Sequence, residues 1–193
     1  MFTRRARFAL VAMALVPASL HAQALGASFG GWMTTSAKEG NDPVSGFRLG
    51  GSYDRPFQTS ARWRIEAAFV QAGFTRDFPL KPNRHVTENS LELAAHWMSA
   101  AVGTARLRVF IGPVLTVGIG CGTDGSNDPN GRIACDGDAG DGTTRVGAAV
   151  GLHAEWGSTR QFTLDLQGQG NTIAAARGQG PAVFVGIGIR FPR

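Results

Sequence analysis

The chain has 193 residues, of which 43% are hydrophobic, 17% are charged and 27 are glycine, with a formal net charge of +5. The hydrophobic content is too high for a disordered chain, and the charged fraction is low for a soluble domain, in which about a quarter of the residues are ionic. Glycine without a three-residue period excludes collagen. Because no apolar run of about 18 residues occurs beyond the N-terminus, a bundle of membrane-spanning helices is excluded as well. The length suits one domain.

Residues 1–24 have the pattern of a cleavable secretory signal peptide. A basic start is followed by an apolar run of about a dozen residues and then by small residues, so that cleavage after Ala22 and cleavage after Ala24 both fit. An uncleaved anchor helix is the alternative, but the apolar run is short for a membrane span. We therefore expect an exported bacterial protein whose folded domain covers 25–193.

The basic character of the chain lies largely in this segment. Of the 19 Lys and Arg residues, Arg4, Arg5 and Arg7 leave with the signal, so that 16 remain against 14 Asp and Glu, a charge of about +2. No basic stripe with interleaved aromatic residues remains in the mature chain. Nucleic acid is therefore not an expected partner.

Beyond residue 24 the hydrophobic residues recur with a period of two. In 143–156, for example, Val146, Val150 and Leu152 alternate with smaller or polar residues, which is the signature of a β-strand with two different faces. The same pattern recurs along the chain, and no segment shows a sustained helical period. It predicts eight strands, at 25–35, 46–54, 62–75, 90–102, 105–120, 143–156, 161–171 and 181–191.

The lengths of the connections favour a barrel over a sandwich. Connections of about 10, 14, 22 and 9 residues alternate along the chain with connections of about 7, 2 and 4 residues. An up-and-down barrel with long loops at one rim and tight turns at the other produces this alternation, as transmembrane barrels do. The predicted fold is therefore all-β: an eight-stranded antiparallel up-and-down transmembrane barrel that follows a cleavable signal peptide.

The composition of the two strand faces predicts that the polar face lies inside. A barrel of eight strands has room for little more than side chains, and one face holds many small residues together with charges of both signs, which can pair in the interior. The other face holds most of the bulky aliphatic residues. The expected interior charge network consists of Arg48, Arg64, Glu66, Glu92, Arg106, Arg108, Arg145, Glu155, Asp165 and Arg190.

Aromatic residues on the apolar face gather at one rim of the predicted barrel. With the mature N-terminus in the periplasm, they lie at the periplasmic strand ends, where an aromatic girdle contacts the membrane interface. The residues of this expected girdle are Tyr53, Trp63, Trp156, Phe162 and Phe191.

In these features the mature chain resembles the small eight-stranded outer-membrane β-barrel superfamily, which includes the transmembrane domain of outer-membrane protein A. The last strand carries the most specific likeness, because alternating hydrophobic residues from Val183 end in the aromatic Phe191. In the superfamily the barrel-assembly machinery recognises such an end; here Pro192 and Arg193 follow it. The resemblance implies insertion into the bacterial outer membrane and contact with its lipid and lipopolysaccharide, as a monomer.

The longest connection holds the remaining chemical candidates. Cys121 and Cys135 flank it, and a pair of cysteines in an exported protein favours a disulfide, which closes a loop of 15 residues here and contributes about 3 kcal/mol. Acidic residues within it are candidate Ca²⁺ ligands. Pro129 stands where an EF-hand loop needs glycine, however, so that a solvated acidic loop is the favoured interpretation. The Ca²⁺ candidates are Asp124, Asp128, Asp136 and Asp138.

No catalytic residue or cofactor is expected. Some barrels of the superfamily are lipid A deacylases, but their His-x-Ser arrangement is missing from this chain. His153 and Glu155, two residues apart, point into the barrel on our assignment, and so do His96 and Glu92, which is typical of a structural network rather than of an acid–base pair. The glycines at 118, 120 and 122 are followed by no helix and so are not a dinucleotide motif.

The sequence thus favours an outer-membrane barrel that acts structurally, in adhesion or in surface interactions through its extracellular loops, and that is not a wide pore. Two alternatives remain open. One is a lipid A-modifying outer-membrane enzyme, and the other is a soluble, lipocalin-like periplasmic barrel that binds a small apolar ligand.

Overall fold

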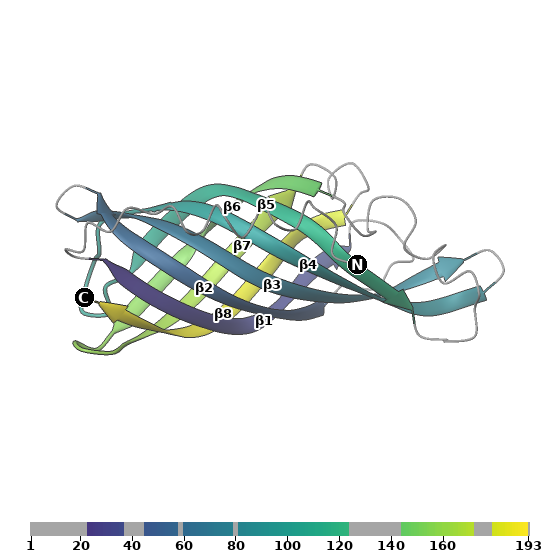
Figure 1. Ribbon diagram of the computed structural model, residues 1–193, viewed down its shortest axis with the longest axis horizontal. Helices are drawn as coiled ribbons and strands as arrows, with labels where there is room; N and C mark the ends of the chain where they lie inside the picture. The colour runs from purple at the N-terminus through teal and green to yellow at the C-terminus, as the bar shows by residue number, and fades with distance from the viewer. Residues whose placement is uncertain are drawn as a thin grey trace, which may run out of the picture.

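The computed structural model describes residues 23–36, 45–57, 60–78, 81–123, 144–171 and 179–192. They form eight antiparallel strands in chain order (Figure 1). The strands are β1 (Ala24–Ser36), β2 (Ser45–Phe57), β3 (Ala61–Phe78), β4 (Lys81–Met98), β5 (Arg108–Thr123), β6 (Thr144–Trp156), β7 (Gln161–Asn171) and β8 (Gln179–Pro192).

Each strand pairs with its neighbours in the sequence, and β1 pairs with β8, so that the sheet closes on itself. In the closing pair Ala24 lies opposite Pro192 and Phe29 lies opposite Ile187. Closure gives every strand a partner on both sides and removes the free edges that would invite aggregation. The predicted all-β, eight-stranded up-and-down barrel is confirmed.

The two ends of the barrel differ. One end, the turn end, holds the start of β1, the finish of β8 and the three connections 58–60, 99–107 and 157–160. The other, the loop end, holds the connections 37–44, 79–80, 124–143 and 172–178, the third of which is the longest of the chain. It also holds a hairpin of β3 and β4 that projects beyond the remaining strands, at the far side from the C-terminus (Figure 1). Its pairing continues to Phe78 opposite Lys81.

This hairpin corrects the prediction of a connection over 76–89 and of a fourth strand beginning at 90. The structure starts β4 at Lys81, nine residues earlier. Period-two alternation arises only where the two faces of a strand lie in different surroundings. A two-stranded ribbon outside the barrel wall can continue its backbone pairing even where hydrophobic and polar residues do not alternate. Pro79 and Pro82 weaken the strand pattern further.

The connection between β4 and β5 is also longer than the two residues predicted. β4 ends at Met98 and β5 begins at Arg108, with Val102 and Leu107 joined by an isolated bridge. Gly103 and Arg106 adopt φ angles of 72° and 42°. These left-handed backbone conformations occur at the first and last residues of a four-residue turn. The turn interrupts the alternation of hydrophobic and polar residues that the sequence suggests for this region.

The wall of the barrel is apolar outside and polar inside. Among outward residues, Phe162 is 63% exposed and Ile187 is 65% exposed, whereas the inward His153 and Glu155 are fully buried. This distribution is the reverse of that in a water-soluble barrel, whose interior is apolar. Within the ranges that the structure describes, no helix has the length and hydrophobicity to cross a membrane.

Large aromatic side chains and glycines fill the lumen together. The Phe184 ring lies so close to Gly30 and Gly186 that a methyl group at either would overlap it, and Phe110 lies in the same way against Gly151. Phe110 is 2% exposed and Phe184 is 4% exposed. The inward glycines therefore make room for bulky side chains inside a narrow barrel.

Candidate functional site

The chemistry-bearing residues of the described chain gather in the lumen. Six cationic side chains and six carboxylates face one another there, and every one of them takes part in an ion pair with another member of the set. This lumen charge network consists of Arg48, Arg62, Arg64, Arg108, Arg145, Arg190, Asp54, Glu66, Glu88, Glu92, Glu155 and Asp165.

All but one of the residues expected in the interior lie in this network. Arg106 is the exception, because it is exposed in the turn before β5, and its predicted interior position is wrong. Its backbone N–H donates to the Gly103 carbonyl at 3.2 Å. Because residues 103–106 form a turn before β5, the alternation of β5 does not extend back to Arg106.

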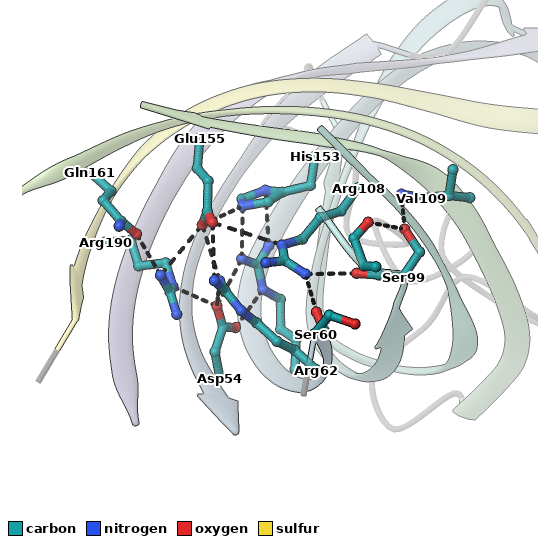
Figure 2. Close-up of polar contacts among 12 residues, drawn as sticks. Asp54, Ser60, Arg62, Ser99, Arg108, Val109, His153, Glu155, Gln161 and Arg190 are labelled. Atoms are coloured by element: carbon teal, nitrogen blue, oxygen red, sulfur yellow. Dashed lines mark hydrogen bonds and ion pairs between the residues drawn. The ribbon is translucent and has the colours of Figure 1, made fainter. Parts of the chain in front are cut away.

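The part of the network nearest the turn end is built around Asp54 (Figure 2). Arg64 of β3 reaches its carboxylate through two nitrogens, with Nε to Oδ1 at 2.7 Å and Nη2 to Oδ2 at 3.2 Å. Arg190 of β8 approaches from the opposite side, with Nε to Oδ2 at 2.7 Å. Asp54 is 1% exposed, so its charge is balanced by these two guanidinium groups in place of water.

Glu155 is the second centre of this region, and Figure 2 shows it surrounded by cationic groups. Both of its oxygens accept from Arg62, at 3.0 and 3.1 Å, and Arg190 lies 3.4 Å away. Arg108 Nε lies 3.8 Å from Glu155 Oε1. Three guanidinium groups thus converge on one fully buried carboxylate, which ties β3, β5 and β8 to β6 across the lumen.

His153 lies between two carboxylates and one arginine. Its Nδ1 is 2.6 Å from Asp165 Oδ1, and its Nε2 is 3.6 Å from Glu155 Oε2. The two Nη atoms of Arg64 lie 3.3 and 3.4 Å from the ring nitrogens. His153 is fully buried. A histidine held in this way has no open side for a substrate, so the geometry is that of a structural member of the network.

Arg108 joins the network to the turns below it. Its Nη1 donates to the backbone carbonyls of Ser60 and Ser99, each at 2.7 Å, and these residues belong to two different connections (Figure 2). Ser99 Oγ in turn accepts from the Val109 backbone N–H at 3.0 Å. One buried guanidinium therefore holds two turns of the turn end against the first residues of β5.

In the middle of the lumen Arg48 binds two glutamates. Arg48 Nη1 lies 2.7 Å from Glu66, while its Nε and Nη2 contact one oxygen of Glu92 at 3.0 and 2.7 Å. The guanidinium carbon also lies 5.0 Å from the centre of the Phe184 ring, within the range of a cation–π contact. The second Glu92 oxygen accepts from Gln169 at 2.9 Å. These contacts cross the barrel from β2 to β7 and β8.

Towards the loop end the lumen continues with a further ion pair and with Trp32. Arg145 of β6 contacts Glu88 of β4. The indole N–H of Trp32 donates to the Gln71 backbone carbonyl at 3.1 Å. The side chain of Gln71 donates to Asn89 at 3.0 Å on the outer face, where this cross-strand pair follows that of Phe69 and Leu91. Trp32 reaches β3 across the glycine at position 46, where a methyl group would overlap the same carbonyl oxygen.

Sequence reasoning did not include three members of the network, Asp54, Arg62 and Glu88. The signal was present, because their even positions match those of Arg48, Arg64 and Glu92 on the same strands. Two of them lie at predicted strand ends and Glu88 lies in a segment predicted to be a loop, so that they were left outside the alternation.

The aromatic residues of the expected girdle all lie at the turn end. Trp63, Trp156, Phe162 and Phe191 are 43% to 63% exposed on the outer face, and Tyr53 is half-buried. Trp156 lies directly opposite Phe162. Two further outward aromatics belong to the same rim: Trp97, opposite Trp63, and Phe57, whose ring lies 6.3 Å from that of Trp63.

The remaining candidates fall partly or wholly outside the described residues. Cys121 lies near the end of β5, whereas Cys135 is not among the described residues, so the disulfide stays a prediction. Asp124, Asp128, Asp136 and Asp138 also lie outside them, as does the signal segment up to residue 22. Among the residues that the structure does describe, no group of three or more His, Cys, Asp or Glu could hold a metal ion.

Comparison with known proteins gives a likeness of architecture. No family model matches the sequence, and no curated protein matches it either. Among solved structures, the attachment invasion locus protein Ail of Yersinia pestis is 12% identical, with a TM-score of 0.48, and the match covers 89% of this chain and 100% of that one. The translocator domain of the autotransporter NalP from Neisseria meningitidis is 11% identical, with a TM-score of 0.34, over 97% and 94% of the two chains.

A second structure of Ail, in a phospholipid bilayer nanodisc, is 14% identical, with a TM-score of 0.40, over 87% of this chain and 99% of that one. The closed, eight-stranded antiparallel barrel is the architecture of the small outer-membrane barrels. This chain has that fold. The assignment rests on its own strand pairing and closure rather than on these scores.

Proposed function

We propose that the protein is an integral outer-membrane barrel that acts as a closed, lipid-embedded scaffold and presents its loop end at the cell surface. The observation that carries this proposal is the inverted polarity of the wall. Large apolar side chains are exposed on every strand, including Leu25, Phe29, Ile111 and Val150, while the members of the lumen charge network are buried or half-buried. Water would penalise such a surface, whereas hydrocarbon stabilises it.

The height of the apolar surface fits a bilayer. On β5 the exposed apolar residues extend from Val109 to Ile119. Ten steps of about 3.3 Å give about 33 Å along the strand, and a strand tilt of about 40° reduces this to about 25 Å, the height of the apolar band of an outer-membrane barrel. The girdle at the turn end then lies at one interface of the membrane, as aromatic residues do.

The lumen supports a role other than solute transport. The ion pairs of Arg48 with Glu66 and Glu92 cross the middle of the barrel, and Phe110 and Phe184 occupy the space beside them. The same burial disfavours the lipid A-modifying alternative, because His153 and Glu155 are fully buried and face away from lipid. A soluble barrel for an apolar ligand is disfavoured because the interior is charged.

With the turn end in the periplasm, as short turns are in such barrels, the loop end with its projecting β3–β4 hairpin faces outward. We assign the surface-interaction role, adhesive or structural, to this end, where lipopolysaccharide is also in reach. Ail, the attachment invasion locus protein, has a similar barrel architecture. The attachment that its name states is a property of Ail.

Cell fractionation and gel migration test the proposal. The mature protein should be recovered with outer membranes, require detergent for extraction, and migrate differently on gels with and without heating, because a closed barrel resists unfolding by the gel detergent. Planar-bilayer recordings of the purified protein should show no large, stable conductance. Recovery in the soluble periplasmic fraction, without detergent, would overturn the assignment.

A further inference from the structure

The carboxylates that do not belong to the lumen charge network lie, by sequence, at one end of the barrel, whereas basic residues occur at both ends. Of the 14 acidic residues in the chain, six belong to the lumen charge network, and none lies in the connections of the turn end. The other eight lie, by sequence, at or beyond the strand ends of the loop end: Glu39, Asp42, Asp77, Asp124, Asp128, Asp136, Asp138 and Asp141.

The turn end carries exposed arginines, and among the residues that the structure describes there no carboxylate is exposed. Arg55, Arg106 and Arg160 are all exposed, and among the described residues none of them forms an ion pair. Each belongs to a different hairpin: Arg55 to the β2–β3 hairpin, Arg106 to the β4–β5 connection and Arg160 to the β6–β7 connection. The arginines are therefore distributed around the rim rather than gathered on one side.

Two of these arginines, Arg55 and Arg160, are adjacent to the aromatic girdle. Arg55 lies directly opposite Trp63 in the β2–β3 pair and two residues beyond Tyr53, and Arg160 is two residues from Phe162. Two strand residues span about 7 Å, or about 5 Å along the membrane normal with the tilt of such strands. The headgroup layer beside the hydrocarbon core is about 5 to 8 Å thick. With the girdle at the interface, Arg55 and Arg160 lie at the depth of the lipid phosphates, and Arg106 is exposed in a turn at the same rim.

We infer that this ring of arginines at the turn end, defined as Arg55, Arg106 and Arg160, binds the headgroups of anionic phospholipids in the periplasmic leaflet. The inference rests on the proposed function, because it requires the girdle to lie at a membrane interface. A guanidinium group donates to phosphate oxygens through a planar fork. Lipids surround a barrel on all sides, so a ring suits them, whereas a protein partner would need a patch on one side.

Tryptophan quenching provides the test, because three of the four tryptophans of the chain, Trp63, Trp97 and Trp156, lie in the girdle beside these arginines. The mature protein is reconstituted into vesicles of phosphatidylcholine that contain a fixed fraction of brominated phosphatidylglycerol or of brominated phosphatidylcholine. A cation near the membrane surface contributes about 1 kcal/mol of attraction to anionic lipid, which is about fivefold in binding at a lipid site beside one arginine. Brominated phosphatidylglycerol should therefore quench more strongly.

Two matched variants locate the effect. The triple substitution Arg55→Gln, Arg106→Gln and Arg160→Gln should bring the two lipids to equal quenching. The control, Lys38→Gln, Arg132→Gln and Arg177→Gln, removes the same charge at the loop end and should keep the wild-type preference. High salt should weaken the preference, and inorganic phosphate at matched ionic strength should not weaken it further.

Each outcome decides a separate question. No quenching by either lipid would mean that the barrel is not embedded, and the proposed function would fail. Quenching without preference in the wild type, or an equal loss in both triple variants, would overturn the arginine ring while leaving the barrel in the membrane. Selective competition by inorganic phosphate would indicate a free-phosphate site and would also overturn it. Should the arginine triple variant not fold, as shown by lost heat-modifiable migration, Arg160→Gln alone should lower the preference partially.

Discussion

Replacing Arg48 with methionine should destabilise the barrel far more than neutralising either of its partners. Arg48 is 4% exposed and holds Glu66 and Glu92, each at 2.7 Å. In Arg48→Met both carboxylates stay buried without a counter-charge, and breaking a buried pair in this way costs about 3 to 5 kcal/mol. In Glu92→Gln, Arg48 keeps its pair with Glu66 and the amide oxygen can still accept, so that we expect a cost of about 1 to 2 kcal/mol.

The measurement is urea unfolding of the folded barrel in detergent micelles, followed by tryptophan fluorescence and by the heat-modifiable gel band. With a urea dependence of about 2 kcal/mol per molar, Arg48→Met should lower the midpoint by about 2 M and Glu92→Gln by less than about 1 M. The triple variant Arg48→Met, Glu66→Gln and Glu92→Gln removes the whole set of charges and should recover most of the loss, as neutral replacements of buried pairs do. Equal midpoints for Arg48→Met and Glu92→Gln would show that water screens the lumen and would refute the reasoning.

Three further predictions follow from other parts of the barrel. Ile187→Arg, at a lipid-facing position that is 65% exposed, should cost about 2 to 4 kcal/mol in vesicles, whereas Phe191→Arg at the girdle should cost about 1 kcal/mol or less; equal costs in urea titrations would argue against a bilayer around the barrel. Gly46→Ala should destabilise by about 1 to 3 kcal/mol, because the methyl group would overlap the Gln71 carbonyl, while Gly31→Ala, with nothing nearer than 3.8 Å, should be tolerated in the same titration. Reduction of the mature protein should shift its gel mobility and lower its stability by about 3 kcal/mol, and Cys135→Ser should abolish the shift; an unshifted wild-type band would exclude the disulfide.

The sequence predicts the barrel well because the wall separates two different environments. Wherever a strand has hydrocarbon on one side and the lumen on the other, its residues must alternate, as Val146, Val150 and Leu152 do on β6. The predicted strand over 161–171 therefore coincides with β7. Where a strand leaves this boundary, as β3 and β4 do at the loop end, the alternation loses its cause and the prediction failed.

The sequence predicts which charged side chains face the lumen, but it does not predict which of them pair with one another. The alternation along each strand is enough to assign Arg48, Glu66 and Glu92 to the lumen. It does not predict that one guanidinium group contacts both glutamates, one on β3 and one on β4. Such pairings depend on the shear of the closed barrel, which staggers the strands and sets the height of each residue in the lumen. Arg106 shows the converse limit, since one four-residue turn moves an arginine from the expected interior to the exposed rim.

The balance of charge in the lumen bears on where recognition can occur. Six arginines and six carboxylates pair with one another inside the barrel, and burial without a partner is costly for either sign. The network therefore constrains its own members, and the formal charges of its twelve described residues balance one another. Outside the lumen the two signs are distributed unequally. The exposed charges that the structure describes at the turn end are Arg55, Arg106 and Arg160, whereas by sequence the strand ends and connections of the loop end carry eight acidic and six basic residues. Electrostatic recognition of anionic groups is therefore expected at the turn end, where the described charges have one sign.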